Sequence, residues 1–516
     1  MTDNTKQRLA KNTLFLYARM LFSMAVSLYT SRVVLNALGV SDYGIYNVVG
    51  GVLALFGFFN SSMSVASQRF LSFDLGTKNQ AQLNKTFNVT LNIHIGIALL
   101  VFIVAETAGL WLVKDQLDLP ADRMEAALFV YHFSIVSSMI SITQTPFSAL
   151  IIAHERMNIF AVVSIAEASL KLVAVYLLQL SPFDKLKTYS VLLLLITLFI
   201  STVYKLYCVK KFDESKFRLV LDKTLHRRIL SFSGWNLFGN IAGVAKGQGT
   251  NVLLNIFFGT ILNAAYGIMM QVQNAVNLFV NNFQMAVNPL ITKSYATGDL
   301  VGMKKLVFHS AKICYFVVFM LICPIIYSVD FILGWWLNQS VPYAAGFTTL
   351  TLINLLIESI SRPLITAAMA TGNIKLYQIV LGSILFLNLP LSYLAFKWFS
   401  LPTLFLHIAI ALSLVILGLR LLFLVKLIHL DLLKFAKQVF IPIAGVSALS
   451  VGVMYVIRTA GFTADSFIEF ISISALLCTV NAASILLLGL KKSERTMIWN
   501  LLNRKIKKKQ ALNITH

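Results

Sequence analysis

Three basic side chains, Arg19, Arg32 and Lys246, lie within apolar stretches that are long enough to cross a bilayer. The two stretches, residues 14–38 and 232–258, contain no Asp or Glu. A charged side chain at the centre of a membrane-spanning helix costs about 2.5–3.5 kcal/mol on insertion scales, so it usually faces a cavity or a partner. Cations removed from water attract phosphate strongly. The pattern therefore predicts a cationic cavity for an anionic substrate.

The two arginines lie on different faces of the first apolar stretch. Arg19 shares a face with Ser23 and Thr30 and can reach a cavity from the cytoplasmic side. Arg32 stands thirteen residues further on, roughly 140° away on an ideal helix. It is close to the outer end, where a long side chain can extend to the membrane surface. We therefore rank Arg19 and Lys246 ahead of Arg32, which we expect to be an outer anchor or a ligand in an outward-facing state.

Small and amide side chains recur at spacings of three and four residues in residues 44–68, 232–258 and 263–290, which places them on one face of each predicted helix. Hydrocarbon offers amides no hydrogen-bond partners, so these stripes must face another helix or a wet cavity. Amides can hold helices together, but the length and symmetry of the stripes favour a cavity that sugar hydroxyls could use. The predicted lining residues are Asn47, Ser61, Ser64, Gln68, Asn236, Asn240, Asn274, Asn277, Asn281, Gln284 and Asn288.

Two acids within the apolar stretches have a basic residue one helical turn away. Glu167 precedes Lys171 by four residues and Glu358 precedes Arg362 by four, so we expect each pair to neutralise itself within its own helix. Glu106 has no such neighbour, and its role is open. We expect the histidines of these stretches, His94, His132 and His407, to be hydrogen-bonded interior residues.

Composition identifies the chain as a polytopic membrane protein, with 58% hydrophobic residues, 12% charged residues and a mean hydropathy of +0.77. Its net charge of +22 does not form a basic face with interleaved aromatics, so we expect no nucleic-acid partner. Lys and Arg gather in alternate loops and at both ends, which predicts cytoplasmic termini. A window of roughly 20 residues gives about fourteen spans. They are 14–38, 44–68, 87–113, 126–152, 158–180, 188–209, 232–258, 263–290, 306–334, 343–370, 375–399, 402–427, 438–458 and 467–490.

A basic segment divides the spans into two portions, and "VVLNALGVSDYGIYNVV" is faintly echoed by "VLLNIFFGTILNAAYGIMMQV". Repeated halves are common in secondary transporters, which bind substrate between them. The predicted order is a six-helix lobe, a basic cytoplasmic linker, a second six-helix lobe, two additional helices and a basic cytoplasmic tail. These parts correspond to residues 1–209, 210–231, 232–427, 428–490 and 491–516.

The sequence offers no support for an enzyme. No connection is long enough to fold a catalytic domain, and no Walker A loop, HExxH or GxSxG occurs. The four cysteines form no CxxC pair, and no His cluster has metal-ligand spacing. We therefore expect buried free thiols, no metal and no cofactor, with transport driven by an ion gradient, the membrane potential or the substrate gradient.

Two motifs carry a family resemblance. "LGVSDYGIYNVVGGV" follows Arg32 and predicts a tight outer hairpin with Asp42 in an exposed turn, and "SVASQRFLSFDLG" closes the second span. Together they resemble the polysaccharide (Wzx-type, O-antigen) flippases of the multidrug/oligosaccharidyl-lipid/polysaccharide (MOP, MATE-like) superfamily. In this sequence "VVLNA" stands between Arg32 and the Leu-Gly pair.

The resemblance implies an all-α fold of two pseudo-symmetric six-helix lobes plus two C-terminal helices bordering a groove for a lipid tail. The implied activity moves an undecaprenyl-diphosphate-linked oligosaccharide across the bacterial inner membrane by alternating access, for O-antigen, capsule or exopolysaccharide synthesis. Arg19, Arg32 and Arg69 match positions where the family has basic residues, and Lys246 lies in a cavity-forming helix. The implied partners are the lipid-linked oligosaccharide, membrane lipid and the polysaccharide polymerase and export machinery.

Two alternatives remain open. A cation-coupled multidrug exporter of the same superfamily would be expected to carry a carboxylate in the first helix of a half, and neither first helix has one. A membrane glycosyltransferase or polymerase would usually need a large outer loop or a loop bearing a catalytic carboxylate, whereas the outer connections here are short.

Overall fold

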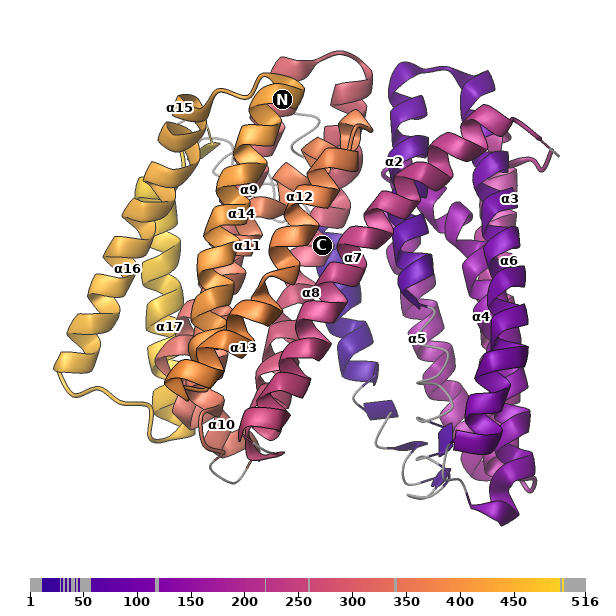
Figure 1. The fold of residues 1–516 in the computed structure, drawn as a ribbon, viewed down its shortest axis with the longest axis horizontal. Coiled ribbons are helices and arrows are strands. Elements are labelled where there is room, and N and C mark those ends of the chain that lie inside the picture. Colours follow the sequence, from indigo (N-terminus) through magenta and orange to yellow (C-terminus); the bar gives the residue numbers. More distant parts are fainter. Residues whose placement is uncertain are drawn as a thin grey trace, which may run out of the picture. The chain divides into compact units, whose positions relative to one another are not determined.

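The computed structural model describes residues 12–27, 29–30, 33–34, 37–38, 42, 45–46, 57–116, 120–218, 220–258, 260–337, 341–491 and 494–495. Within these residues the chain is helical and has no strand (Figure 1). Residues 12–27 are helical, and the first half of the chain continues with α2 (Gly57–Thr77), α3 (Gln80–Val104), α4 (Met124–Ala153), α5 (Met157–Leu180) and α6 (Lys185–Lys211). The second half comprises α7 (Lys223–Phe258), α8 (Thr260–Ala296), α9 (Leu300–Tyr327), α10 (Val329–Leu337), α11 (Ala344–Thr371), α12 (Lys375–Phe386), α13 (Asn388–Phe399), α14 (Leu404–Ile428), α15 (Leu432–Phe435), α16 (Ile441–Thr459) and α17 (Phe467–Ser484).

The predicted all-α membrane class is confirmed. Ten helical segments of the described residues are long and apolar enough to cross a membrane. The count of fourteen and the side of each terminus stay predictions. The structure also differs from the sequence interpretation in detail. α7 begins at Lys223 instead of 232, so the end of the expected linker is helical. The spans expected at 306–334 and 375–399 are interrupted at Ser328 and Leu387.

The chain divides into two compact units. Unit 1 comprises residues 1–245, 281–303 and 366–385, and unit 2 comprises residues 246–280, 304–365 and 386–516. The division falls within α7 and α8, so each of these helices contributes to both units. The boundaries predicted from the sequence at 209, 231 and 427 stay predictions.

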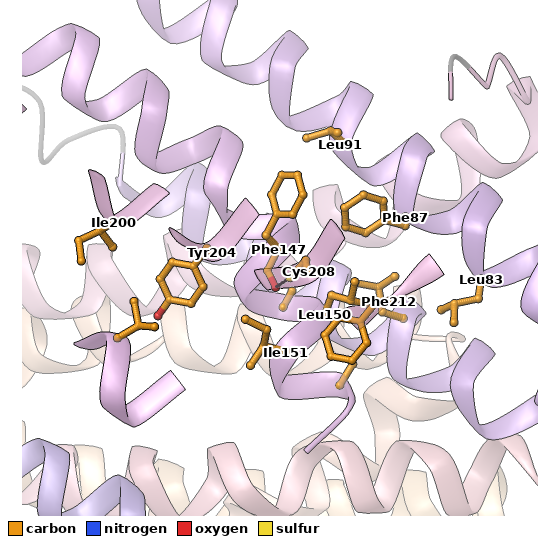
Figure 2. Close-up of a cluster of buried hydrophobic side chains, with 14 of the residues drawn as sticks. Leu83, Phe87, Leu91, Phe147, Leu150, Ile151, Ile200, Tyr204, Cys208 and Phe212 are labelled. Atoms are coloured by element: carbon orange, nitrogen blue, oxygen red, sulfur yellow. Dashed lines mark hydrogen bonds between the residues drawn. The ribbon is translucent and has the colours of Figure 1, made fainter. Parts of the chain in front are cut away.

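The core of unit 1 lies among α3, α4 and α6 and the residues that follow α6. Figure 2 shows Phe87 of α3 beside Phe147 of α4, with ring centroids 5.2 Å apart in an edge-to-face arrangement. Cys208 of α6 and Phe212 join the same cluster, and both are buried. None of the four cysteines forms a disulfide; three are buried and Cys478 is half-buried, so the predicted buried thiols are confirmed for three of them.

In unit 1, Arg123 forms ion pairs with two acids, Asp42 and Asp184. Arg123 donates to Asp42 at 2.6 Å and to Asp184 at 2.6 Å, and Asp184 also caps α6 by accepting from the Lys187 amide. Hydrogen bonds to Asp184 and Asp42 raise the pKa of Arg123, so the charge is fixed. Asp42 is thus a half-buried ion-pair partner, not the exposed turn residue expected from sequence, because the segment before α4 brings Arg123 to it.

Unit 2 is built around aromatic contacts of α7, α13 and α14. The Phe396 ring lies 4.9 Å from Phe258 and 6.4 Å from Phe405, and Phe405 is 5.2 Å from Phe347 of α11. The last two membrane helices, α16 and α17, pack on each other. A capping box formed by Ser466 and Glu469 fixes the start of α17.

Candidate functional site

Unit 1 contains a cavity of about 530 Å³. The first helix and α5 supply most of its wall, and α6 adds Tyr189. Its polar and charged lining consists of Arg19, Ser23, Ser27, Thr30, Tyr46, Ser164, Glu167, Lys171 and Tyr189. A cavity of this size is typical of a small-molecule or headgroup site.

Arg19 lies in the wall of this cavity, and its guanidinium has hydrogen-bond donors beyond the one that binds Asn282. Its Nη2 donates to Asn282 Oδ1 at 2.9 Å, and its guanidinium lies 5.0 Å from the centre of the Phe160 ring. Its Nε is buried and has no hydrogen-bond partner among the described residues. A guanidinium can donate five hydrogen bonds, so Arg19 can still bind an anion while it holds Asn282.

The same wall contains an acid that the sequence reasoning assigned to a self-neutralising pair. Lys171 Nζ lies 2.7 Å from Glu167 Oε1, which confirms the pair expected within α5. The acid-free cavity was predicted from the first helices of the two halves alone. In the structure, α5 adds the carboxylate of Glu167 to the cavity wall. Two cations and one carboxylate line the cavity, so its fixed charge is positive by one when all three are ionised.

Hydroxyls and aromatic rings complete the cavity. The rings of Tyr46 and Tyr189 meet edge to face with centroids 5.2 Å apart. Thr30 is buried, and its hydroxyl has no partner among the described residues. Buried polar groups are normally satisfied, so an open hydroxyl in a cavity wall suits a polar ligand or water.

Arg69 lies in a different place from Arg19. Its Nε donates to the Met369 carbonyl at 3.2 Å and its Nη2 to the Ala370 carbonyl at 2.8 Å, at the C-terminal end of α11. Cations are favourable there because the last carbonyls of a helix carry partial negative charge. Gln68 and Asn288 line a pocket of about 50 Å³ beside Arg69. The role of Arg69 as a diphosphate ligand stays a prediction.

Two of the predicted lining amides connect helices instead. Asn236 Nδ2 donates to the Ser62 carbonyl at 3.3 Å, and Asn240 Nδ2 donates to Ser62 Oγ at 2.8 Å. Gln378 Nε2 adds a 3.5 Å contact to Asn236 Oδ1. These bonds hold α7 to α2 and α12 to α7, which is the helix-joining role considered as the alternative to a cavity lining.

The other predicted residues are distributed between the units. Ser64 accepts from Gln68 at 3.3 Å, Ser61 and Asn281 are exposed, and Gln284 is buried. Unit 2 contains the half-buried Lys246, the exposed Asn274, and Asn277, which accepts from Arg362 at 3.3 Å. Arg32 and Asn47 lie outside the described residues.

The acid left open by the sequence has a partner. Glu106 Oε1 lies 2.9 Å from Nδ1 of His132, from which it is 26 residues distant in the chain. His94 is fully buried and bonds the Thr90 carbonyl, as expected for an interior histidine. His132 and His407 are hydrogen-bonded but exposed, so the expectation of an interior position is wrong for these two.

Sequence reasoning missed two buried acids at the end of unit 1 where Arg69 lies. Glu155 Oε1 accepts from Lys293 at 2.7 Å, and Glu214 accepts from His154 at 2.6 Å and from Gln80 at 2.8 Å. Their partners lie 138, 60 and 134 residues away, so no local spacing could reveal them. The described residues contain no cluster of His, Cys, Asp and Glu that could hold a metal ion.

No protein-family model and no curated protein sequence matches the chain. Solved structures do match. The outward-facing form of a multidrug-resistance MATE transporter of the MOP superfamily gives a TM-score of 0.70 over 82% of this chain and 96% of its own, at 11% identity. A MOP-superfamily transporter from Pyrococcus furiosus, described by a binding pocket of reversed polarity that suggests a different function, gives 0.67 over 82% and 96%, at 11% identity. The bent form of the Vibrio cholerae MATE transporter VcmN gives 0.68 over 83% and 98%, at 14% identity.

The chain therefore has the two-lobed, MATE-like fold of membrane transporters of the MOP superfamily. At these identities the similarity establishes the fold alone. The choice of substrate depends on the chemistry of the cavity wall.

Proposed function

We propose that the protein is a flippase that moves a lipid-linked oligosaccharide across the bacterial inner membrane by alternating access. The observation that carries this proposal is the position of Arg19 in the wall of a cavity that is also lined by hydroxyls and tyrosines. A polyprenyl diphosphate glycan combines the groups that such a wall recognises: an anionic diphosphate, sugar hydroxyls and apolar sugar faces.

Each part of the cavity has a distinct task in this proposal. Arg19 binds the diphosphate with its unused guanidinium donors, and Lys171 turns from Glu167 to add a second cation. Tyr46 and Tyr189 contact the sugar, and the polyprenyl tail stays in the lipid. Lys246, Arg32 and the amides of α8 act at other stages of transport, and α16 and α17 border the tail. Delivery of the flipped lipid to a polymerase and export machinery completes the role.

The flippase proposal is also supported by the different binding pockets that this fold can contain. A solved transporter of the superfamily is described by a binding pocket of reversed polarity that suggests a different function. The same helical frame thus accommodates cavities of different charge, and a net positive wall in this chain suits an anionic substrate better than a cationic drug.

One observation favours a second candidate, a cation-coupled multidrug exporter. Glu167 supplies the cavity carboxylate that an ion-coupled exporter needs, although it comes from α5 and not from the first helix of a half. Its partner Lys171 competes with an external cation for the carboxylate, which weighs against this candidate.

The two candidates predict opposite effects of two substitutions in a strain that lacks its own flippase. If the protein is a flippase, Arg19→Ala abolishes surface polysaccharide, Arg19→Lys restores part of it, and Lys246→Ala reduces it. Glu167→Gln then retains function because it removes a competitor for Lys171.

If the protein is a drug exporter, Glu167→Gln abolishes ion-dependent dye efflux and Arg19→Ala does not. The exposed Lys210→Ala serves as the charge control at matched expression. Normal polysaccharide with both Arg19→Ala and Lys246→Ala would rule out the diphosphate site.

A further inference from the structure

The small pocket beside Arg69 is separate in its chemistry from the Arg19 cavity. It has a volume of about 50 Å³ and lies among α2, α8 and α11 of unit 1. Its polar lining consists of Gln68, Arg69, Ser72, Asn288, Thr292 and Thr366. Roughly 10–15 Å³ of such space holds one water molecule, so the pocket holds a few waters or one small ion.

Arg69 carries a buried positive charge, every other residue that lines the pocket is neutral, and Arg228 is a second cation whose charge acts on Arg69. Arg69 is 5% exposed, its two hydrogen bonds go to neutral carbonyls, and no carboxylate lines the pocket. Asp74 is the acid whose charge acts on Arg69, but it accepts a hydrogen bond from Thr86 and is not part of the lining. Buried charges are normally paired because desolvation is costly, and Arg69 lacks a direct anionic partner among the described residues.

The open groups around this charge are hydrogen-bond donors. Ser72 is 1% exposed, and its hydroxyl has no partner among the described residues. Asn288 accepts from Thr366 with Oδ1 at 2.7 Å, which leaves its amide N–H groups for a ligand. Arg69 uses Nε and one Nη2 bond, so part of the guanidinium is also open. A guanidinium, a hydroxyl and an amide that converge on a small space are suited to a group that only accepts hydrogen bonds.

We propose that this pocket binds one halide ion, chloride in the cell, on Arg69, Ser72 and Asn288. A halide is little larger than a water molecule, accepts several hydrogen bonds and supplies the negative charge that Arg69 lacks. The bound ion stabilises the guanidinium where it holds the carbonyls of Met369 and Ala370, so halide binding strengthens the attachment of α2 to the end of α11. This site is independent of the substrate proposed for the Arg19 cavity.

The test is halide binding to the purified full-length protein in detergent, at constant ionic strength, with chloride replaced by gluconate. Thermal unfolding should show saturable stabilisation by chloride and by bromide. ³⁵Cl relaxation should show bound chloride that bromide displaces. Ser72→Ala removes one donor without removing the charge and should weaken halide binding about five- to tenfold. Arg69→Gln should abolish it, and Arg218→Gln, an exposed arginine outside the pocket, should leave it unchanged.

Each outcome decides the proposal. Equal unfolding in chloride and gluconate, or no displaceable ³⁵Cl signal, would mean that the pocket holds water only and would overturn the proposal. Equal halide affinity in Ser72→Ala and the unmodified protein would show that any bound halide lies elsewhere. Because Ser72→Ala leaves the contacts of Arg69 with α11 intact, the test stands even where Arg69→Gln does not fold.

Discussion

At the scale of single residues, the structure explains how charges are tolerated in a largely apolar chain. Lys312 of α9 has a side chain only 3% exposed, and Glu494 accepts from its Nζ at 2.8 Å and bonds Nδ1 of His309 at 2.8 Å. Burial alone would raise the pKa of Glu494, but the hydrogen bonds from His309 and Lys312 outweigh it and lower the pKa to about 2. Glu494 is therefore ionised at any physiological pH.

We predict that Glu494→Gln destabilises the protein by about 3–5 kcal/mol at pH 7.5, because it leaves Lys312 buried without a counter-charge. Circular dichroism of the protein unfolding in detergent measures this free-energy difference. Asp431→Asn, which breaks the exposed pair with Lys434, should cost less than about 1 kcal/mol. Because folding lowers the pKa of Glu494, its contribution to the free energy of unfolding is fully present above the pKa of the unfolded state. That contribution is lost as the pH falls toward 2. Equal stability of the two variants at pH 7.5 would contradict the prediction.

At the scale of helices, the amide stripes prove to have two uses. On α7, Asn236 and Asn240 bond to Ser62 of α2 and so join helices. On α8, Asn274 and Asn281 are exposed in the structure and point away from the packed core. An exposed asparagine in a membrane helix must meet water or another polar group, because lipid leaves the amide unsatisfied.

We predict that Asn274→Cys and Asn281→Cys react in intact cells with a membrane-impermeant maleimide, because the amide face of α8 is predicted to line a wet cavity. The native cysteines are first replaced by alanine. Two controls bracket the result: Leu198→Cys on the exposed apolar face of α6, and Val280→Cys, which is 1% exposed on α8 itself. Both should stay unlabelled. Protection of both asparagine positions to the same degree as Leu198→Cys would assign them to helix joining or to lipid.

At the scale of the whole molecule, ten helices of the described residues meet the length and hydropathy of a span, and the fold is that of MATE-like transporters. The apolar stretches of roughly 20 residues predict about fourteen spans, and the charge distribution between alternate loops predicts that both ends are in the cytoplasm. An even number of spans is required by that orientation, so topology can be tested loop by loop.

We predict that alkaline phosphatase is active when fused after residue 183, 401 or 463, and inactive after residue 213, 373 or 430. Green fluorescent protein at the last three sites should fluoresce, because these connections are expected to be cytoplasmic. The measurement uses matched expression of each fusion. Equal activity at two sites that are separated by a single predicted span, such as 401 and 430, would remove that span and change the predicted orientation of everything that follows.

The sequence by itself determined the membrane class and the approximate helices. These properties follow from local composition, because each span must satisfy its own backbone bonds and present about twenty apolar residues to lipid. The i,i+4 pair of Glu167 and Lys171 was predictable for the same reason, since its geometry lies within one helix.

Only the tertiary structure decided which of these residues share a site. It brought Glu167 and Lys171 into the Arg19 cavity and separated Arg69 from it, because Arg69 bonds to α11 carbonyls some 300 residues away in the chain. It also assigned Asn236 and Asn240 to the contact with Ser62. Such contacts depend on which helices pack together, and helix periodicity specifies a face without specifying its neighbour.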